Sequence, residues 1–360
     1  MNLEEKIGQL LICGFEGYTP SKEIEQLIKE YHIGGVILFN RNIKDPQQTA
    51  RLCNSLQKMA KTPLFISVDQ EGGKVSRLPK PFTQFPGNAA IGKGDSVKLA
   101  YSFGEITARE LKAVGINMDF APVLDVNTNP QNPVINERAF SDNPVKVSML
   151  GLSVIAGLQD NGIIACCKHF PGHGDTSLDS HYQLPIVEHD LERLREIEFL
   201  PFRQAVQNGV AAVMTAHVIY KGIDKKYPAA ISEKIVHNLL RREMGFNGLV
   251  ITDDLEMKAI ADNYNIEDAA ILAVSAGADI VLVCRDHGKQ KAVRDALIKA
   301  VKDKTISEGR IDESIERIDT IKKSFLKDVL VNLKNIKGVV GNKRHLDIAK
   351  KITSYSRTPL

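Results

Sequence analysis

Short apolar segments alternate with longer amphipathic ones along most of the chain. The apolar segments are rich in β-branched residues, which is typical of strands buried on both faces of a parallel sheet. Strands are predicted at about residues 9–14, 35–39, 64–69, 117–121, 163–169, 211–217, 249–253 and 279–284. Between them, the helical period of the apolar positions predicts helices at 45–60, 96–114, 145–159, 191–208 and 231–244, several of which end near a glycine.

This order of elements predicts an α/β fold. Parallel strands need a crossover connection, and a helix is its usual form. The eight predicted strands, each followed by a crossover, therefore favour a (β/α)8 barrel of the TIM type. In such barrels the functional groups lie at the carboxyl ends of the strands, so that mouth is where a site is expected.

The pattern changes after residue 305. A long, charged helical pattern at 307–334 is expected to pack across the barrel, and another helix begins at 346–352. We interpret residues 1–334 as a barrel domain with a packed C-terminal helix, and residues 335–360 as a short helical tail.

Composition and charge narrow the class of protein. A hydrophobic fraction of 43% and a charged fraction of 25% are ordinary for a soluble globular chain, and a net charge of +3 gives no indication of nucleic-acid binding. Glu4 and Glu5 lie where a secretory signal would carry basic residues, so the chain is expected to be cytoplasmic. No apolar span approaches the roughly 20 residues of a membrane helix. The five cysteines lie mostly in apolar segments and are expected to be reduced thiols.

Polar side chains end several of the predicted strands. They are Asp69, Asp119, His169, His217, Asp253 with Asp254, and Arg285. Because the carboxyl ends of barrel strands meet at one mouth, these groups are expected to gather there. The opposite mouth shows no comparable set in the sequence. Single polar groups at strand ends are often just solvated, but a set of this size indicates a site.

The most concentrated chemistry lies in the loop that follows the strand at 163–169. It reads Lys-His-Phe-Pro-Gly-His-Gly-Asp-Thr-Ser-Leu-Asp-Ser-His from Lys168 to His181. A carboxylate at Asp179 that orients the His181 imidazole would suit the ring to give and take a proton near neutral pH. Taken alone, His181 could instead be a solvated loop histidine.

Other carboxylates and cations have less specific settings. A carboxylate at the strand end at Asp253 could be a nucleophile, a general base or a metal ligand, whereas Asp254 is expected to cap the following helical turn. Asp69 is joined to Arg77 across a glycine turn, and Arg138 lies in a further loop. Either arginine could be an ordinary surface group.

Together these motifs resemble one branch of a known family. Asp-Gln-Glu-Gly-Gly at 69–73, Lys-His-Phe-Pro-Gly-His-Gly-Asp-Thr at 168–176, Asp-Ser-His at 179–181 and Thr-Asp-Asp-Leu-Glu-Met at 252–257 are similar to the β-N-acetylhexosaminidase (β-N-acetylglucosaminidase) branch of glycoside hydrolase family 3. The resemblance runs in order from about Leu3 to Arg317. It implies a retaining exo-glycosidase on a (β/α)8 barrel that acts on peptidoglycan-derived sugars.

The resemblance also implies roles for particular residues. Asp253 matches the nucleophile that forms a glycosyl-enzyme intermediate, and His181, held by Asp179, matches the acid/base. The residues that match those holding the terminal N-acetylglucosamine are Asp69, Arg77, Arg138, Lys168 and His169. The implied partners are small glycans such as N-acetylglucosaminides and muropeptides, with no cofactor, no metal, no nucleic acid and no membrane.

The tail departs from part of this branch. In longer relatives an α/β sandwich domain follows the barrel, and residues 341–356 resemble the linker and opening helix of that domain. We therefore expect either a one-domain enzyme with a vestigial tail or a truncated form of a two-domain ancestor. Because the acid/base lies on a barrel loop, loss of the second domain need not abolish catalysis.

Several alternatives stay open at this point. A metal-dependent hydrolase could use His169, His173, His181, Asp175 and Asp179 as ligands. A sugar-binding protein could retain the Asp69 and Arg77 pair without turnover. A family 3 β-glucosidase, or an enzyme of this branch that uses phosphate as the acceptor, is also possible, and the natural aglycone cannot be read from the sequence.

Overall fold

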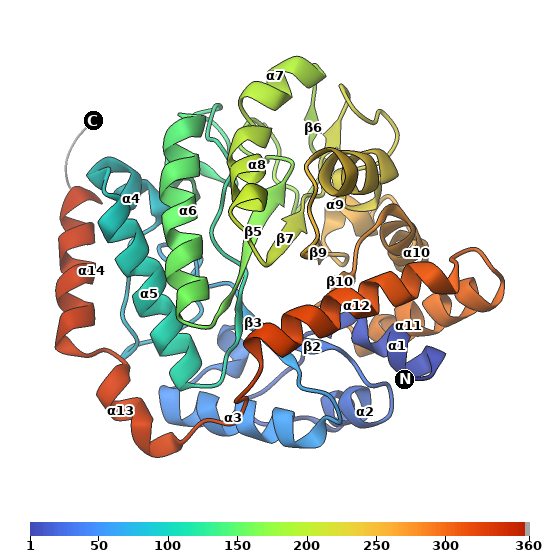
Figure 1. Ribbon diagram of the computed structural model, residues 1–360, viewed down its shortest axis with the longest axis horizontal. Helices are drawn as coiled ribbons and strands as arrows, with labels where there is room; N and C mark the ends of the chain where they lie inside the picture. Colours follow the sequence, from blue (N-terminus) through green and yellow to red (C-terminus); the bar gives the residue numbers. More distant parts are fainter. Residues whose placement is uncertain (357–360) are drawn as a thin grey trace.

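The computed structural model describes residues 1–356 and contains a closed barrel of eight parallel strands (Figure 1). In order around the barrel they are β1 (Leu11–Cys13), β2 (Gly35–Leu38), β3 (Phe65–Val68), β4 (Met118–Asp119), β5 (Ile164–Phe170), β7 (Ala212–Thr215), β9 (Leu249–Asp254) and β10 (Ile280–Val283), which pairs with β1. Each predicted segment overlaps one of these strands. The predicted (β/α)8 fold is therefore confirmed.

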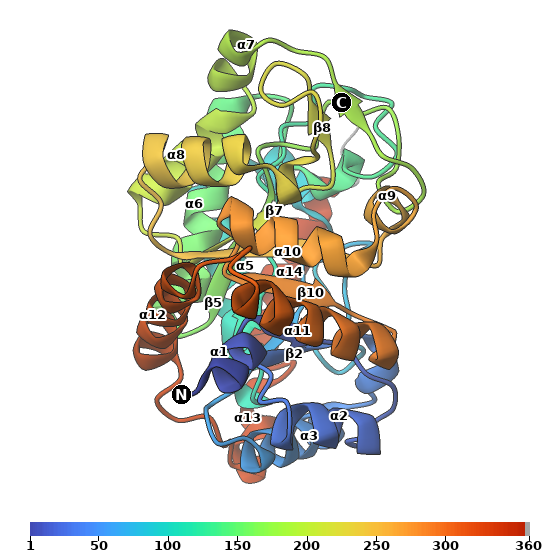
Figure 2. The ribbon, with the colours of Figure 1, turned by 90° about the vertical axis from the view of Figure 1, so that its right-hand side faces the viewer.

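Helices surround the barrel and cover its outer face (Figures 1 and 2). They are α1 (Leu3–Gln9), α2 (Lys22–Lys29), α3 (Pro46–Met59), α4 (Asn88–Gly94), α5 (Val97–Ala113), α6 (Pro144–Asp160), α7 (Leu191–Glu196), α8 (Phe199–Gln207), η4 (Lys234–Glu243), α9 (Lys258–Ala261), α10 (Ile266–Ala276), α11 (His287–Lys302), α12 (Glu308–Phe325), α13 (Ile336–Val339) and α14 (Lys343–Ser356). Figure 2 shows α10 and α11 packed side by side. A second, two-stranded sheet of β6 (Ile186–Val187) and β8 (Ile219–Tyr220) was not predicted.

Three helix predictions were wrong in detail. The predicted helix at 191–208 is divided between α7 and α8, because Glu198 is buried at the break and Pro201 lacks the N–H that a continuous helix would need. The predicted helix at 231–244 starts later and is a π-helix, η4. The helix predicted at 307–334 ends at Phe325 as α12. After α12, the backbone N–H and carbonyl of Val331 are bound by the Asn54 side chain on α3.

The amino end of β10 holds a buried ionic cluster. The Asp279 side chain is fully buried and accepts hydrogen bonds from the Val250 backbone N–H at 2.9 Å and from the Ser314 hydroxyl at 2.8 Å. It also pairs with three guanidinium groups, those of Arg241, Arg310 and Arg317. The expectation that the opposite mouth has no comparable polar set was therefore wrong. The cluster is internally paired and fastens α12 to the barrel.

Removing this carboxylate should be costly for stability. We expect Asp279→Ala to lower the free energy of unfolding by about 3–5 kcal/mol, because it leaves the buried Arg241 guanidinium without a counter-charge, whereas Arg310 and Arg317 still pair with Glu313. Denaturant unfolding of the variant measures this change. Asp295→Ala is a suitable control, since Asp295 pairs with Arg294 at the surface and its loss should cost less than about 1 kcal/mol. Equal effects of the two substitutions would contradict a structural role for the cluster.

The tail packs against the barrel through α14. This helix lies along α4 and α5, with His345, Ala349 and Ile352 buried (Figure 1). The His345 Nδ1–H donates to Glu110 Oε1 over 2.8 Å, and Glu110 also accepts the Gly341 N–H. These contacts attach residues 341–352 to the barrel domain, which was predicted to span residues 1–334. The relation of the tail to a second domain stays a prediction, and residues 357–360 lie outside the described part of the chain.

Two expectations from composition can be compared with the structure. All five cysteines are buried and free, as predicted. Among residues 1–356, the longest helices are too short or too polar for any of them to cross a bilayer.

Candidate active site

A buried charge cluster joins the ends of β3 and β5. The Lys168 ammonium lies 2.7 Å from Asp69 Oδ1 and 2.7 Å from Glu71 Oε1. Arg138, from the loop after β4, donates to both oxygens of Glu71 at 2.9 Å. Burial raises the pKa of Glu71, but Arg138 and Lys168 outweigh it and hold that pKa well below its usual range. Glu71 is therefore ionised, and its contacts with Arg138 and Lys168 hold the cluster in one arrangement.

The glycine turn after β3 brings Arg77 back to Asp69. Gly72 and Gly73 both have positive φ angles, 84° and 61°, a conformation that other residues rarely adopt. The Arg77 backbone N–H donates to the Gln70 side chain at 2.9 Å, and Arg77 Nη2 lies 3.8 Å from Asp69 Oδ2. The predicted proximity of Asp69 and Arg77 is thus confirmed.

Asp125 is the main site residue that sequence reasoning missed. Its carboxylate accepts from His169 Nδ1–H at 2.7 Å, and from the backbone N–H groups of His169 and His173 at 3.1 and 2.7 Å. Burial raises the pKa of Asp125, but the two histidines outweigh it and lower that pKa. The Nδ1–H of His169 donates to Asp125, and the other ring nitrogen, Nε2, lies 3.3 Å from Arg138 Nη2. In the sequence, Asp125 is a single carboxylate in the apolar segment after β4, a pattern that is also typical of an ordinary loop.

Asp253 lies at the end of β9 among imidazoles. Burial raises the pKa of Asp253, but His217 and His169 outweigh it, and the Asp254 N–H and His181 act in the same direction. The net pKa is lower than usual, so Asp253 is an ionised carboxylate. His217 is itself fixed, because its Nε2–H donates to the Asp254 carbonyl at 2.9 Å.

Asp254 does not cap a helix, contrary to expectation. It is the last residue of β9, and its Oδ1 accepts from the N–H groups of Glu256 at 3.1 Å and Cys284 at 3.3 Å. Helix α9 begins later, after Met257. Burial, with the charges of Glu256 and Asp253, raises the pKa of Asp254 to about 7. Two adjacent carboxyl groups therefore differ in protonation at neutral pH.

This difference predicts a pH dependence of stability. The folded-state pKa of Asp254 lies above its unfolded value of about 3.9. Protonation of Asp254 therefore stabilises the folded state fully at a pH below about 3.9, and this stabilisation is lost as the pH rises toward 7. Asp254→Asn has no such titration. We expect the variant to gain stability relative to the wild type by up to about 1.4 kcal/mol per pH unit in this window. Unfolding at pH 5 and at pH 8 measures it, and parallel behaviour of the two proteins would contradict the assignment.

His181 and Asp179 form a pair on the exposed loop after β5. His181 Nδ1 lies 2.7 Å from Asp179 Oδ1, which also accepts the His181 backbone N–H at 2.8 Å. The His181 side chain is 57% exposed. His181 is nevertheless among the groups that lower the pKa of Asp253, so the ring lies within electrostatic reach of that carboxylate. With Nδ1 bound to Asp179, Nε2 is the atom that can exchange a proton with a bound molecule.

The remaining strand-end residues do different things. Asp119 is fully buried below the charge cluster and accepts the Gln70 N–H at 2.9 Å. Burial raises its pKa well above the usual range, so it is neutral. Arg285 has an exposed side chain, and its backbone N–H donates to Glu256. Neither residue shares the pairing that fixes Lys168 and Arg138.

The five candidate metal ligands are engaged separately. His169 is bound to Asp125, His181 to Asp179, and Asp175 to His189 Nε2 at 2.6 Å. His173 contacts Thr176 and Ser180 instead. Within residues 1–356 no three His, Cys, Asp or Glu side chains are placed to hold a metal ion.

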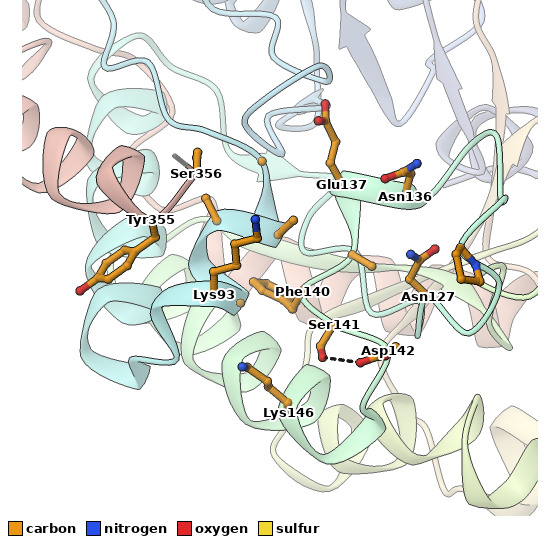
Figure 3. Close-up of a pocket in the computed structure, with 16 residues that line it drawn as sticks. Lys93, Asn127, Asn136, Glu137, Phe140, Ser141, Asp142, Lys146, Tyr355 and Ser356 are labelled. Carbon is orange, nitrogen blue, oxygen red and sulfur yellow. Dashed lines mark hydrogen bonds between the residues drawn. The ribbon is translucent and has the colours of Figure 1, made fainter. Parts of the chain in front are cut away.

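A separate hollow of about 850 Å³ lies beside the Arg138 loop (Figure 3). Asn136 and Glu137 line it, together with Lys93 and Phe140, whereas Arg138 does not. Figure 3 shows Glu137, Asn136 and Asn127 on the loop side of this hollow. This hollow contains neither Asp253 and Asp254 nor Asp179 and His181. We therefore place the candidate active site at the barrel mouth.

Comparisons with known proteins show similarity over most of the chain. The profile of the "Glycosyl hydrolase family 3 N terminal domain" matches residues 2–321. The chain is 37% identical to "Beta-hexosaminidase A" of Pseudoalteromonas piscicida over 91% of this chain and 59% of that protein. It is 39% identical to a "Beta-hexosaminidase" of Methylobacillus flagellatus over 76% of this chain and 79% of that protein.

A solved structure is similar over nearly the whole chain. It is a glycoside hydrolase family 3 beta-N-acetylglucosaminidase from Paenibacillus sp. str. FPU-7, with 43% identity and a TM-score of 0.95, covering 99% of this chain and 69% of that one. The chain thus spans about three fifths of the Pseudoalteromonas relative and about two thirds of the Paenibacillus protein.

Proposed function

The chain belongs to glycosyl hydrolase family 3, and we propose that it is a retaining exo-β-N-acetylhexosaminidase that releases terminal β-linked N-acetylglucosamine. The names of its relatives support this substrate. The observation that carries the mechanism is one juxtaposition: an ionised Asp253 lies within electrostatic reach of a histidine that is bound to a carboxylate.

The two groups divide the chemistry of glycoside cleavage. In the first step the Asp253 carboxylate attacks the anomeric carbon, and the leaving oxygen takes a proton from His181 Nε2. A glycosyl ester on Asp253 results. In the second step His181 accepts a proton from water, which attacks the anomeric carbon and frees Asp253. Two displacements on the same carbon retain the β configuration.

Asp179 makes the imidazole suitable for both steps. Its carboxylate receives the Nδ1 proton and thereby leaves Nε2 to act alone. It also stabilises the imidazolium that must exist before protonation of the leaving group and again after water attack. The exposure of His181 allows water to reach Nε2 in the second step.

The buried cluster is the proposed subsite for the terminal sugar. It combines Asp69, Arg77, Arg138, Lys168 and His169. Carboxylate oxygens accept from sugar hydroxyls, while ammonium and guanidinium groups donate to them. Because Glu71 and Asp125 hold these side chains in place, the subsite needs little reorganisation when it binds a sugar. The proposed substrates are small glycans, including fragments of peptidoglycan, and the proposed compartment is the cytoplasm.

Selectivity for the acetamido group tests the substrate. We expect kcat/KM for an aryl β-N-acetylglucosaminide to exceed that for the matching β-glucoside by at least about a hundredfold, since a site built to bind a polar substituent rejects analogues that lack it. Arg138→Ala should weaken both substrates alike. Comparable rates on the two sugars would instead indicate a β-glucosidase.

The same assay distinguishes hydrolysis from phosphorolysis. The glycoside is incubated with and without phosphate, and the products are identified. Free N-acetylglucosamine in both conditions supports the proposed hydrolysis. A sugar 1-phosphate that forms only with phosphate would show that phosphate, not water, is the acceptor.

A further inference from the structure

We propose that His173 and Ser180 are positioning residues that hold the Asp179–His181 pair in place against the sugar-binding cluster. This inference rests on the proposed function, because it assigns a task to residues that support the acid/base. Neither residue would touch the substrate. Their role would be to set where His181 stands relative to Asp253.

A continuous buried chain of hydrogen bonds runs from one half of the site to the other. Asp125 Oδ1 accepts the backbone N–H groups of His169 and His173. The His173 ring then contacts Thr176 Oγ1 at 2.8 Å through Nδ1, and Ser180 Oγ at 3.0 Å through Nε2. His173 and Ser180 are only 2% and 3% exposed, and Thr176 is fully buried.

The contacts of Thr176 determine which nitrogen of His173 carries the proton. The Thr176 hydroxyl donates its proton to the His173 carbonyl at 3.1 Å and accepts from the Asn132 amide at 3.2 Å. The Thr176 oxygen therefore receives the Nδ1–H of His173. The Nε2 lone pair is left to accept the Ser180 hydroxyl proton. Burial, with the charge of His169, lowers the pKa of His173 to about 4, so this neutral form persists at neutral pH.

Ser180 lies between the two residues of the catalytic pair and is held on two sides. Its hydroxyl is bound by His173, and its carbonyl accepts the Ala259 N–H at 3.3 Å from the segment after β9. That segment follows Asp253. The Asp179–His181 pair is thus attached to the buried Ser180. Ser180 contacts His173, whose backbone N–H donates to Asp125, and also Ala259, which follows Asp253 in the chain.

The base of this connection is closely packed. Gly174 lies against the Val126 carbonyl, and a Cβ atom at Gly174 would come within 1.8 Å of that oxygen. The Asn132 amide also donates to the carbonyls of His173 and Gly174. The start of the loop is therefore fixed on the segment that carries Asp125. Only the part from Ser177 to Asp179 lies between the fixed base and Ser180.

This arrangement predicts a specific kinetic defect. Loss of the Ser180 hydroxyl would free His181 to leave its position, while Asp253 and the sugar cluster stay intact. Formation of the glycosyl ester from a substrate with a poor leaving group would slow, whereas its formation from a substrate with a good leaving group would not. A general loss of folding or sugar binding would affect both kinds of substrate.

The test compares Ser180→Ala with Ser177→Ala, the same substitution at an exposed serine of the same loop. Each protein is assayed on a nitrophenyl β-N-acetylglucosaminide and on the β-linked disaccharide of N-acetylglucosamine, whose leaving group is poor. For Ser180→Ala we expect kcat/KM on the disaccharide, which reports the steps up to the glycosyl ester, to fall at least about tenfold, and kcat/KM on the nitrophenyl glycoside less than about threefold. Inhibition by N-acetylglucosamine should be unchanged, and Ser177→Ala should resemble the wild type.

Two further variants keep the test decisive. Ser180→Thr retains the hydroxyl and should restore turnover of the disaccharide relative to Ser180→Ala. Ser180→Cys nearly retains the volume but offers only a weak donor, so it should show the same selective loss even if the alanine variant is unstable. An equal loss on both substrates, or no loss relative to Ser177→Ala, would overturn the inference.

The wild type separates this failure from that of the proposed function. If the wild type cleaves neither glycoside, the proposed activity is wrong. If the wild type cleaves both and His181→Ala loses the disaccharide selectively, but Ser180→Ala does not, only the positioning role is wrong.

Discussion

Asp253→Asn should lower kcat on an aryl β-N-acetylglucosaminide by about three to five powers of ten, with the fold intact. The amide has nearly the same shape as the carboxylate but cannot form the glycosyl ester. The surroundings of Asp253 sharpen this expectation, because burial alone would favour a neutral acid, whereas His217 and His169 keep the group charged. Asp253 is thus held as the carboxylate anion that the proposed nucleophilic role requires.

The control for this variant is its neighbour. Asp254→Asn removes the other carboxylate of the strand end but keeps an oxygen to accept the Glu256 and Cys284 N–H groups, so it should reduce kcat by no more than about tenfold. Steady-state rates and thermal unfolding of both variants are sufficient. Turnover above about a tenth of the wild type in Asp253→Asn would remove Asp253 as the nucleophile.

His181→Ala should produce a loss that depends on the leaving group. Without an acid, cleavage of the N-acetylglucosamine disaccharide should slow by about a thousandfold or more, whereas formation of the glycosyl ester from a nitrophenyl glycoside should slow by less than about tenfold. The second step also lacks its base. The intermediate should therefore accumulate with the nitrophenyl substrate, as a mass increase of one N-acetylglucosaminyl group on the protein.

Peptide mapping and the variant Asp179→Ala provide two further tests of this prediction. Peptide mapping should place the added mass on the segment that contains Asp253, which ties both roles to one experiment. Asp179→Ala serves as the partial variant, because it leaves the imidazole but removes its orienting carboxylate, and its defect should have the same direction and be smaller. Equal losses of His181→Ala on both substrates, with no added mass, would contradict an acid/base role.

The barrel could be predicted from the sequence because its strands are buried on both faces. Segments such as Val281 to Val283 or Val213 to Thr215 are continuous apolar or β-branched runs, and their order along the chain determines the topology once parallel crossovers are assumed. The positions of Asp69, His169 and Asp253 at the ends of such runs then locate the mouth. Periodicity and a topological rule are sufficient for this part.

Other features could not be predicted, because they depend on contacts between distant segments. Nothing near Asp125 in the sequence indicates that its carboxylate will accept a hydrogen bond from His169, which lies 44 residues away along the chain. The segment after α12 is held by Asn54 of α3, whose side chain accepts the Val331 N–H. The ionic cluster at Asp279 combines residues from η4, β9 and α12 with the segment before β10. In each case the residue type is ordinary and only the tertiary structure makes it significant.

The sharing of Glu71 between Lys168 and Arg138 makes the proposed sugar subsite resistant to gradual change. Either cation, if replaced alone, leaves the other beside a carboxylate that was balanced by two charges, so the effects of single substitutions should not add. A variant with altered sugar preference would need coordinated changes at three positions. Epistasis of this kind predicts that laboratory evolution of the enzyme will more readily alter the exposed loop after β5 than the cluster below it.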